Sequence, residues 1–270
     1  MRQPYLASTL ALALLSFASS QVAFGQETVQ EQPADPPRSS APPPTAPATG
    51  SARNKEELPR FALALKTGLA TFGSGLDRLE CSGADCNGLA AGERDYQFRP
   101  SPVIALGAYY QPTALVRTGP ALSYGFQQSV TFNSSNGHTE LGNLLTLGFS
   151  LELTPRLSRK LWLVPELQLS YALLFPGGEF ERQLDRWQTS CGQSFATFDC
   201  GSLKGSRSGF HAALGLGLLY AAAPSVRLRI DVLAEYYYFP LLDLSAANAD
   251  IELTEHTSGI RQVLLAGLEF

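Results

Sequence analysis

Apolar residues alternate with polar or small residues along the last twelve positions of the chain, from Gly259 to Phe270. Successive side chains of a strand point to opposite faces, so a period of two separates two surfaces. The first face is Ile260, Gln262, Leu264, Ala266, Leu268 and Phe270, and the second is Arg261, Val263, Leu265, Gly267 and Glu269. One face suits hydrocarbon and the other mixes small and charged groups, which predicts an amphipathic β-strand ending on an aromatic residue.

The same period of two recurs in seven earlier segments. They are residues 61–72, 103–111, 119–127, 141–153, 161–173, 210–220 and 226–238. Segment 161–173 is the clearest, because its leucines fall on alternate positions, whereas a helix would space them by three and four. These lengths suit a tilted strand that crosses a bilayer in roughly 9–11 residues.

The connections between these segments alternate between long and short. The long ones are residues 73–101, 128–140, 175–208 and 239–258, and the short ones are turns at Pro112, Pro155 and Pro224. Long external loops alternating with short periplasmic turns are typical of transmembrane barrels. We therefore predict an all-β fold, an eight-stranded antiparallel up-and-down transmembrane β-barrel. An even number of strands would leave the N-terminal linker and the C-terminus together on the periplasmic side.

Residues 1–25 have the features of a secretory signal peptide. Arg2 precedes an uncharged apolar run at 6–17, and small residues at Ala23 and Gly25 predict cleavage before Gln26. The run is shorter than the roughly 20 residues that a membrane-spanning helix needs. The chain is therefore expected to be exported.

Residues 26–59 have a different composition from the segments that follow. Seven prolines lie between Pro33 and Pro47, and the rest of the segment is rich in Ala, Ser, Thr, Gln and Glu. Such a segment cannot bury a core, which predicts a disordered Pro-rich periplasmic linker. It would act as a passive spacer or as a tether that makes a periplasmic contact, and residues 60–270 would form the barrel.

Net charge and mean hydropathy bear on which kinds of partner and which class of protein can be expected. Cleavage after residue 25 removes one Arg and no acid, so the formal charge of −4 becomes −5. This mild acidity gives no reason to expect a nucleic acid partner. The mean hydropathy of −0.02 fits a barrel with alternating faces, and it fits a soluble periplasmic domain equally well.

The signal peptide, the period of two and the terminal aromatic together resemble the small eight-stranded bacterial outer-membrane barrels of the OmpA/OmpX type. The resemblance covers residues 61–270 and includes no residue-specific motif. It implies an integral outer-membrane protein without a cofactor, surrounded by outer-membrane lipids and lipopolysaccharide. It also implies that Phe270 forms part of the signal that the barrel assembly machinery recognises.

Charged residues fall on the faces expected to point into the barrel. They are Lys66, Glu152, Glu166, Arg227, Arg229, Asp231, Glu235, Arg261 and Glu269. Charges are costly on the lipid face, so an inward charge network is expected. If Glu235 lies opposite Arg261, the same antiparallel register places Arg227 opposite Glu269, and both pairs would stabilise the last hairpin. Trp162 and Tyr237 would fill the lumen further, giving a closed interior, with a narrow ion channel as the alternative.

The four cysteines fall in two of the predicted external loops. Cys81 and Cys86 lie in the first, and Cys191 and Cys200 lie in the third. Export makes disulfides the default, and four cysteines allow three pairings, of which the two local ones are the simplest. A metal site is not expected, because no His or acid cluster accompanies them at ligand spacing. Aromatic residues at strand ends, including Tyr109, Tyr110 and the run from Tyr236 to Phe239, are expected to form interfacial girdles.

An enzyme is a further possibility. Ser208 and His211 lie at the outer end of one predicted strand, as in barrels that modify lipid A, but no orienting acid is defined. Alternation also turns His211 towards the lumen, away from lipid substrates. We therefore expect a non-enzymatic barrel that serves envelope integrity or surface interaction and adhesion through disulfide-braced extracellular loops. The alternatives are a narrow ion or small-solute channel and a lipid A-modifying enzyme.

Overall fold

The computed structural model describes residues 58–84, 86, 92–133, 138–194, 198–199, 203, 205–246 and 252–270. The predicted signal peptide and the predicted linker up to residue 57 lie outside these residues, and so does Cys200. The strands are β1 (Phe61–Ser82), β2 (Gly92–Phe98), β3 (Ser101–Tyr110), β4 (Val116–Phe132), β5 (His138–Leu153), β6 (Leu161–Pro176), β7 (Phe198–Asp199), β8 (Arg207–Ala223), β9 (Val226–Ala246) and β10 (Glu252–Glu269). Among the described residues, one helix, α2 (Gly178–Ser194), lies between β6 and β7.

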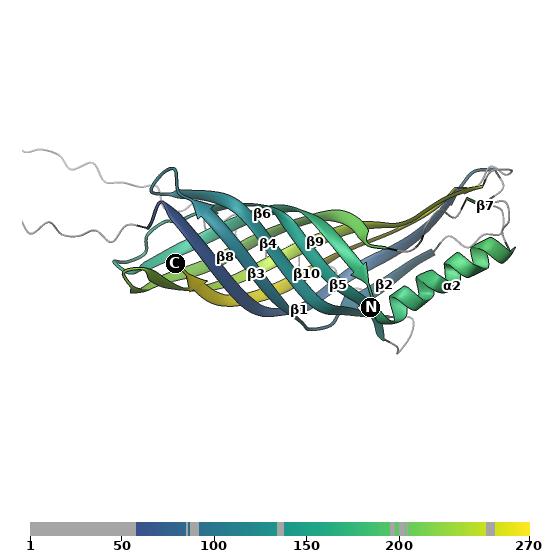
Figure 1. The fold of residues 1–270 in the computed structure, drawn as a ribbon, viewed down its shortest axis with the longest axis horizontal. Helices are drawn as coiled ribbons and strands as arrows, with labels where there is room; N and C mark the ends of the chain where they lie inside the picture. The colour runs from purple at the N-terminus through teal and green to yellow at the C-terminus, as the bar shows by residue number, and fades with distance from the viewer. Residues whose placement is uncertain are drawn as a thin grey trace, which may run out of the picture. The chain divides into compact units, whose positions relative to one another are not determined.

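The sheet closes on itself by antiparallel pairing of its first and last long strands. β1 pairs with β10 from Ala64 opposite Glu269 to Ser82 opposite Glu252. β2 and β3 follow one another between β1 and β4, so they share one position in the ring. The described strands therefore form an eight-membered, up-and-down barrel with tilted walls (Figure 1), and this part of the prediction is confirmed. β7 pairs only with the far end of β9.

The barrel wall is apolar outside and polar inside. Outward side chains with at least two-fifths of their surface exposed include Leu63, Leu65, Leu69, Ile104, Leu106, Leu147, Phe149, Leu151, Leu167, Leu169, Leu214, Leu216, Leu218, Ile230, Val232, Ile260 and Leu264. Their neighbours in sequence point into the barrel and are buried. The exposed apolar side chains form a continuous band around the ring, because each strand contributes alternate residues to it. On β1 the band ends at Phe72, and on β10 it ends at Ile260.

Three strands continue well past the apolar band. β1, β9 and β10 extend to Ser82, Ala246 and Glu252, and they project from one end of the barrel (Figure 1). The C-terminus lies at the opposite end. The segments expected to be long loops, 73–101 and 239–258, are therefore largely strand. Backbone pairing continues there although the side chains no longer alternate between apolar and polar, which is why periodicity did not reveal it.

Helix α2 occupies much of the segment expected to be the third loop. Its buried side chains Phe180 and Leu184 pack with Leu174 of β6 and Phe239 of β9. Glu179 and Glu181 in its first turn are placed favourably at the positive end of the helix dipole. Most other positions of the helix are polar, so its short apolar stripe gave little signal in the sequence. No helix in the described part of the chain is long and apolar enough to cross a membrane.

Candidate functional site

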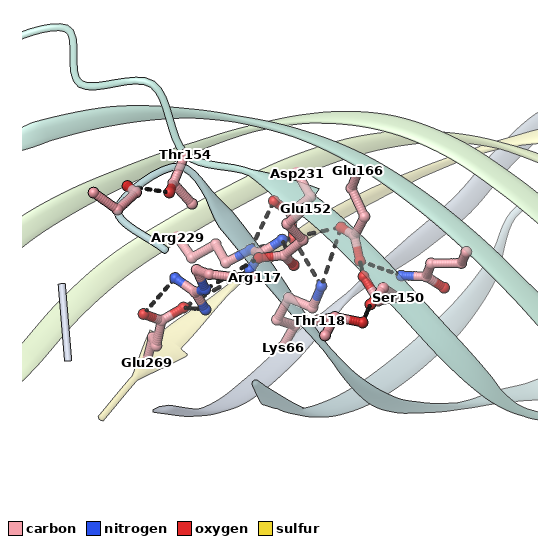
Figure 2. A network of polar contacts seen from close by, with 12 residues as sticks. Lys66, Arg117, Thr118, Ser150, Glu152, Thr154, Glu166, Arg229, Asp231 and Glu269 are labelled. Atoms are coloured by element: carbon pink, nitrogen blue, oxygen red, sulfur yellow. Dashed lines mark hydrogen bonds and ion pairs between the residues drawn. The ribbon is translucent and has the colours of Figure 1, made fainter. Parts of the chain in front are cut away.

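A network of buried charges fills the lumen near the C-terminal end of the barrel (Figure 2). The guanidinium of Arg229 lies at its centre, 2.8 Å from Glu152 and 2.9 Å from Glu166. Its Nε also lies 2.8 Å from an Asp231 carboxylate oxygen. Three strands, β5, β6 and β9, are thus joined through one side chain.

Two further cations complete this network. Lys66 of β1 donates a hydrogen bond of 2.9 Å to Asp231. Arg117 of β4 donates hydrogen bonds of 3.0 and 2.7 Å to the two carboxylate oxygens of Glu269. Arg227 also points inward and is buried. The four cations Lys66, Arg117, Arg227 and Arg229 match the four carboxylates Glu152, Glu166, Asp231 and Glu269, so this part of the lumen is electrically balanced.

The register predicted for the last hairpin is present. Arg261 lies opposite Glu235, and Glu269 lies opposite Arg227. Arg261 Nε is 2.9 Å from a Glu235 oxygen, and Arg261 also donates hydrogen bonds to Gln128 and to the Tyr237 hydroxyl. All nine charged residues expected from the sequence to face inward point into the barrel and are buried.

Two members of the lumen were not foreseen. Arg117 lies in a segment expected to be a turn. It stands an even number of residues before the inward-facing Ala121, so extending the strand pattern back to Arg117 would have placed its side chain inside the barrel. Tyr109 was expected in an outer girdle, which is wrong: it is only 3% exposed and its ring lies 4.7 Å from the Arg117 guanidinium. Phe239 is likewise inside and not in a girdle, whereas Tyr110, Tyr236 and Tyr238 are partly exposed on the outer face.

Small residues on β8 leave room for the buried charges. A Cβ at Gly217 would overlap an Asp231 carboxylate oxygen, and one at Gly215 would overlap the Leu233 side chain. Above the network, a buried apolar cluster that includes Leu233, Val263 and Leu265 fills the lumen. At the opposite edge of the network, Trp162 packs against Leu219. The section of the barrel inside the apolar band is therefore occupied by side chains.

A pocket opens above the Arg261–Glu235 pair, between the projecting strands and α2. We call it the vestibule; its cavity volume is about 70 Å³. Its aromatic lining is Tyr96, Phe98, Phe132, Phe180, Trp187 and Phe239. Tyr237, Arg261 and Gln128 form its floor. The vestibule is thus an aromatic pocket resting on a polar floor.

Two acidic side chains line one wall of the vestibule. Asp77 of β1 and Glu255 of β10 are both buried, and the Arg94 guanidinium of β2 contacts both carboxylates. Asp77 uses one oxygen for Arg94, while its other oxygen, Oδ1, is buried without a hydrogen-bond partner among the described residues. Burial, reinforced by the neighbouring Asp77 charge, raises the pKa of Glu255 to about 7. These groups lie beyond the end of the apolar band.

Ser208 and His211, the possible catalytic pair, do not contact each other. Ser208 is exposed on the outer face of β8, whereas His211 is fully buried in the lumen. His211 Nε2 lies 3.7 Å from Glu235, and its ring packs on Tyr237 with centroids 4.8 Å apart. Residues three apart on a strand face opposite sides, so these two cannot act together on one substrate.

A disulfide joins Cys81 to Cys86 at the tip of β1, with Cα atoms 5.9 Å apart. It is one of the two local pairings predicted. Cys191 lies near the end of α2, and the pairing of Cys191 with Cys200 falls outside the described residues. Within the described residues, no group of three His, Cys, Asp or Glu side chains is arranged to hold a metal ion.

Comparison with protein-family models gives no match, and neither does comparison with curated proteins. Solved structures do resemble the chain at low identity. The outer membrane protein OprG from Pseudomonas aeruginosa is 11% identical, with a TM-score of 0.42, covering 80% of this chain and 98% of its own. The outer membrane protease OmpT from Escherichia coli is 9% identical, with a TM-score of 0.39, covering 80% and 99%. The outer membrane protein AlkL is 13% identical, with a TM-score of 0.38, covering 88% and 97%.

Proposed function

We propose that this protein is a non-conducting, non-enzymatic integral barrel of the bacterial outer membrane that acts through its projecting end. The observation that carries the proposal is the balanced charge network around Arg229, which occupies the lumen inside the apolar band. An outward apolar surface with inward charges is the arrangement that a bilayer demands of a barrel. Outer-membrane lipids and lipopolysaccharide would surround this band.

A closed lumen follows from the energetics of the buried ion pairs. An ion path would require separating Arg229 from carboxylates that lie within 3 Å of it. Removing one partner of a buried ion pair costs roughly 3–5 kcal/mol, because the other charge is left uncompensated. Several such contacts would have to open together, so the resting barrel would not conduct.

The projecting strands then become the part available for partners. We assign them to the extracellular side, which puts the C-terminus and the linker at 26–59 in the periplasm. The Cys81–Cys86 disulfide ties down the tip of β1. A braced strand extension suits surface contact or adhesion, and the barrel with its periplasmic linker would serve envelope integrity. Phe270, beside the closing strand pair, would be the group that the assembly machinery recognises.

Planar-bilayer recording tests the closed lumen. Refolded full-length protein should insert without conductance steps. The double variant Arg117→Ser and Arg229→Ser removes two side chains from the network and should produce a leak, which shows that insertion is detectable. Heat-modifiable gel migration confirms that each protein is folded. Conductance steps from the unaltered protein would overturn the closed lumen and favour the narrow channel.

Cell fractionation tests the location, and lipid analysis tests the absence of enzymatic activity. The mature protein should fractionate with the outer membrane, and recovery in the soluble periplasm would overturn the proposal. Expression should leave the mass of lipid A unchanged, since Ser208 and His211 face opposite sides of the wall. A mass change that disappears in His211→Ala would instead identify a lipid A-modifying enzyme.

A further inference from the structure

The vestibule combines two features that seldom occur together in a packed protein. Its walls are aromatic, with the rings of Phe98, Phe132 and Trp187 on different elements of the fold. Its one charged wall holds two buried carboxylates, Asp77 and Glu255. Aromatic faces attract cations through the negative charge of their π-systems, and buried carboxylates attract them more strongly. Both features therefore favour a positively charged ligand.

The charge balance of the vestibule is negative whenever Glu255, whose pKa is raised to about 7, has lost its proton. At its floor, Arg261 is already paired with Glu235 at 2.9 Å, so that pair contributes no net charge. On its wall, the two carboxylates share one guanidinium, that of Arg94, whose side chain is 46% exposed and therefore partly hydrated. One negative charge is left facing an aromatic space.

Asp77 supplies the sharper indication of a ligand. Its residue is 6% exposed, and besides Arg94 the described part of the chain offers it a hydrogen bond only from the protonated carboxyl of Glu255, so its Oδ1 lacks a donor once Glu255 is ionised. A buried carboxylate oxygen without a donor is costly, and a ligand that brought an N–H group would remove that cost. Asp77 lines the vestibule, so the donor would approach from the pocket side.

We propose that the vestibule binds a small apolar organic amine in its ammonium form, with the ammonium held by Asp77 and Glu255 and the apolar body against the aromatic walls. The excess negative charge disfavours an organic anion. A neutral apolar molecule would fill the aromatic walls but would leave Asp77 Oδ1 without a donor. This site goes beyond the surface role proposed above, and it does not depend on whether the lumen conducts.

Calorimetric titration of the full-length protein in detergent micelles tests the site. The probes are phenethylammonium, its neutral analogue phenethyl alcohol, and the anion hydrocinnamate, which share an aromatic body. Phenethylammonium should bind most tightly. Asp77→Asn or Glu255→Gln should weaken its binding by about tenfold, since each removes a charged hydrogen-bond acceptor.

The matched control is Glu93→Gln. Glu93 precedes Arg94 on β2 and pairs with Arg78 on the other face of the wall. Glu93→Gln therefore removes one negative charge at the same level of the barrel as Asp77, but outside the vestibule. The Glu93→Gln variant should bind phenethylammonium as tightly as the unaltered protein does. Trp187 reports the location of the ligand: the chain has two tryptophans, so in Trp162→Phe the fluorescence comes from Trp187 alone and should change on binding.

Several outcomes would overturn the site. They are the absence of phenethylammonium binding at millimolar concentration, equal binding of the alcohol, tighter binding of hydrocinnamate, and unaltered affinity in both carboxylate variants. An unchanged Trp187 signal during binding would place the ligand elsewhere and also overturn it. Heat-modifiable migration checks folding, and if Asp77→Asn fails to fold, Glu255→Gln decides the result.

Discussion

Arg117 and Glu269 lie 152 residues apart in sequence and meet across the lumen through two parallel hydrogen bonds of 3.0 and 2.7 Å. They belong to β4 and β10, which are not neighbours in the sheet. The pair therefore acts as a cross-brace between opposite parts of the wall. The contribution of this pair to the free energy of unfolding can be measured directly.

Glu269→Gln should lower the free energy of unfolding by about 3 kcal/mol, because it leaves the buried Arg117 charge without its closest carboxylate. The remaining carboxylate near Arg117, Glu152, is 3.5 Å away. Urea unfolding in lipid vesicles, followed by gel migration, provides the measurement. The control is Glu179→Gln, which breaks the exposed Glu179–Arg182 pair of α2 and should cost less than about 1 kcal/mol. Equal losses in the two variants would contradict the cross-brace.

Gly217→Val should destabilise the barrel by about 1–3 kcal/mol through overpacking. Its side chain would occupy the space of the Asp231 carboxylate, which contacts Lys66 and Arg229. Gly92→Ala is the matched control, because a Cβ at that position would meet nothing within 4 Å. The same unfolding assay applies, and a neutral effect of Gly217→Val would show that the network can rearrange at little cost.

Phenethylammonium affinity should rise between pH 6 and pH 8. Glu255 has a pKa raised to about 7 by burial and by Asp77, so it is largely protonated at the lower pH and charged at the higher one. A cation favours the charged form, so binding strengthens as Glu255 loses its proton. The charged groups that face Glu255 are Asp77 from β1 and Arg94 from β2, while β9 places Leu242 opposite it.

Glu255→Gln should abolish most of this pH dependence, because the amide does not titrate. Titrations at three pH values would measure it in both proteins. A persistent rise in the variant would assign the titration to another group, and a flat profile in the unaltered protein would show that Glu255 does not control the site.

Phe180→Ala should release α2 from the mouth of the barrel. Phe180 is buried against side chains of β5, β6 and β9, and loss of a buried Phe costs about 3–5 kcal/mol. Trypsin cleavage after Arg182 or Arg186 should become more than about tenfold faster, because cleavage follows local opening. Thr189→Ala changes an exposed position of the same helix, away from its first turn and from both cleavage sites, and should leave the rate unchanged. Similar rates in both variants would mean that Phe180 does not anchor the helix.

Alternation alone was sufficient to predict the wall of the barrel. Leu264 and Leu265 are chemically identical neighbours, yet Leu264 is half exposed and Leu265 is 2% exposed, as the alternation of side chains along a strand predicts. The hairpin register followed from charge, since Glu235 and Arg261 had to meet on the inward face. These features could be predicted because they depend on residues close in sequence or on strands joined by one turn.

The partners across the lumen could not be predicted in this way. Glu269 lies opposite Arg227 in the sheet, but its carboxylate bonds to Arg117 from a distant strand. That choice depends on the tilt and stagger of the closed barrel, which bring side chains of non-neighbouring strands together. The vestibule was missed for a related reason, because it combines Asp77, Glu255 and α2 from segments that had been expected to be loops.

The position of Glu269 couples charge neutralisation to closure of the ring. The carboxylate that binds Arg117 stands on β10, the strand that pairs with β1 to close the barrel. Before β10 docks, the lumen holds one more cation than anions around Arg229, and the barrel seam between β1 and β10 is open. Sealing the seam and removing the surplus positive charge are therefore a single event, which penalises any partly closed form in hydrocarbon and makes assembly of this barrel effectively all-or-none.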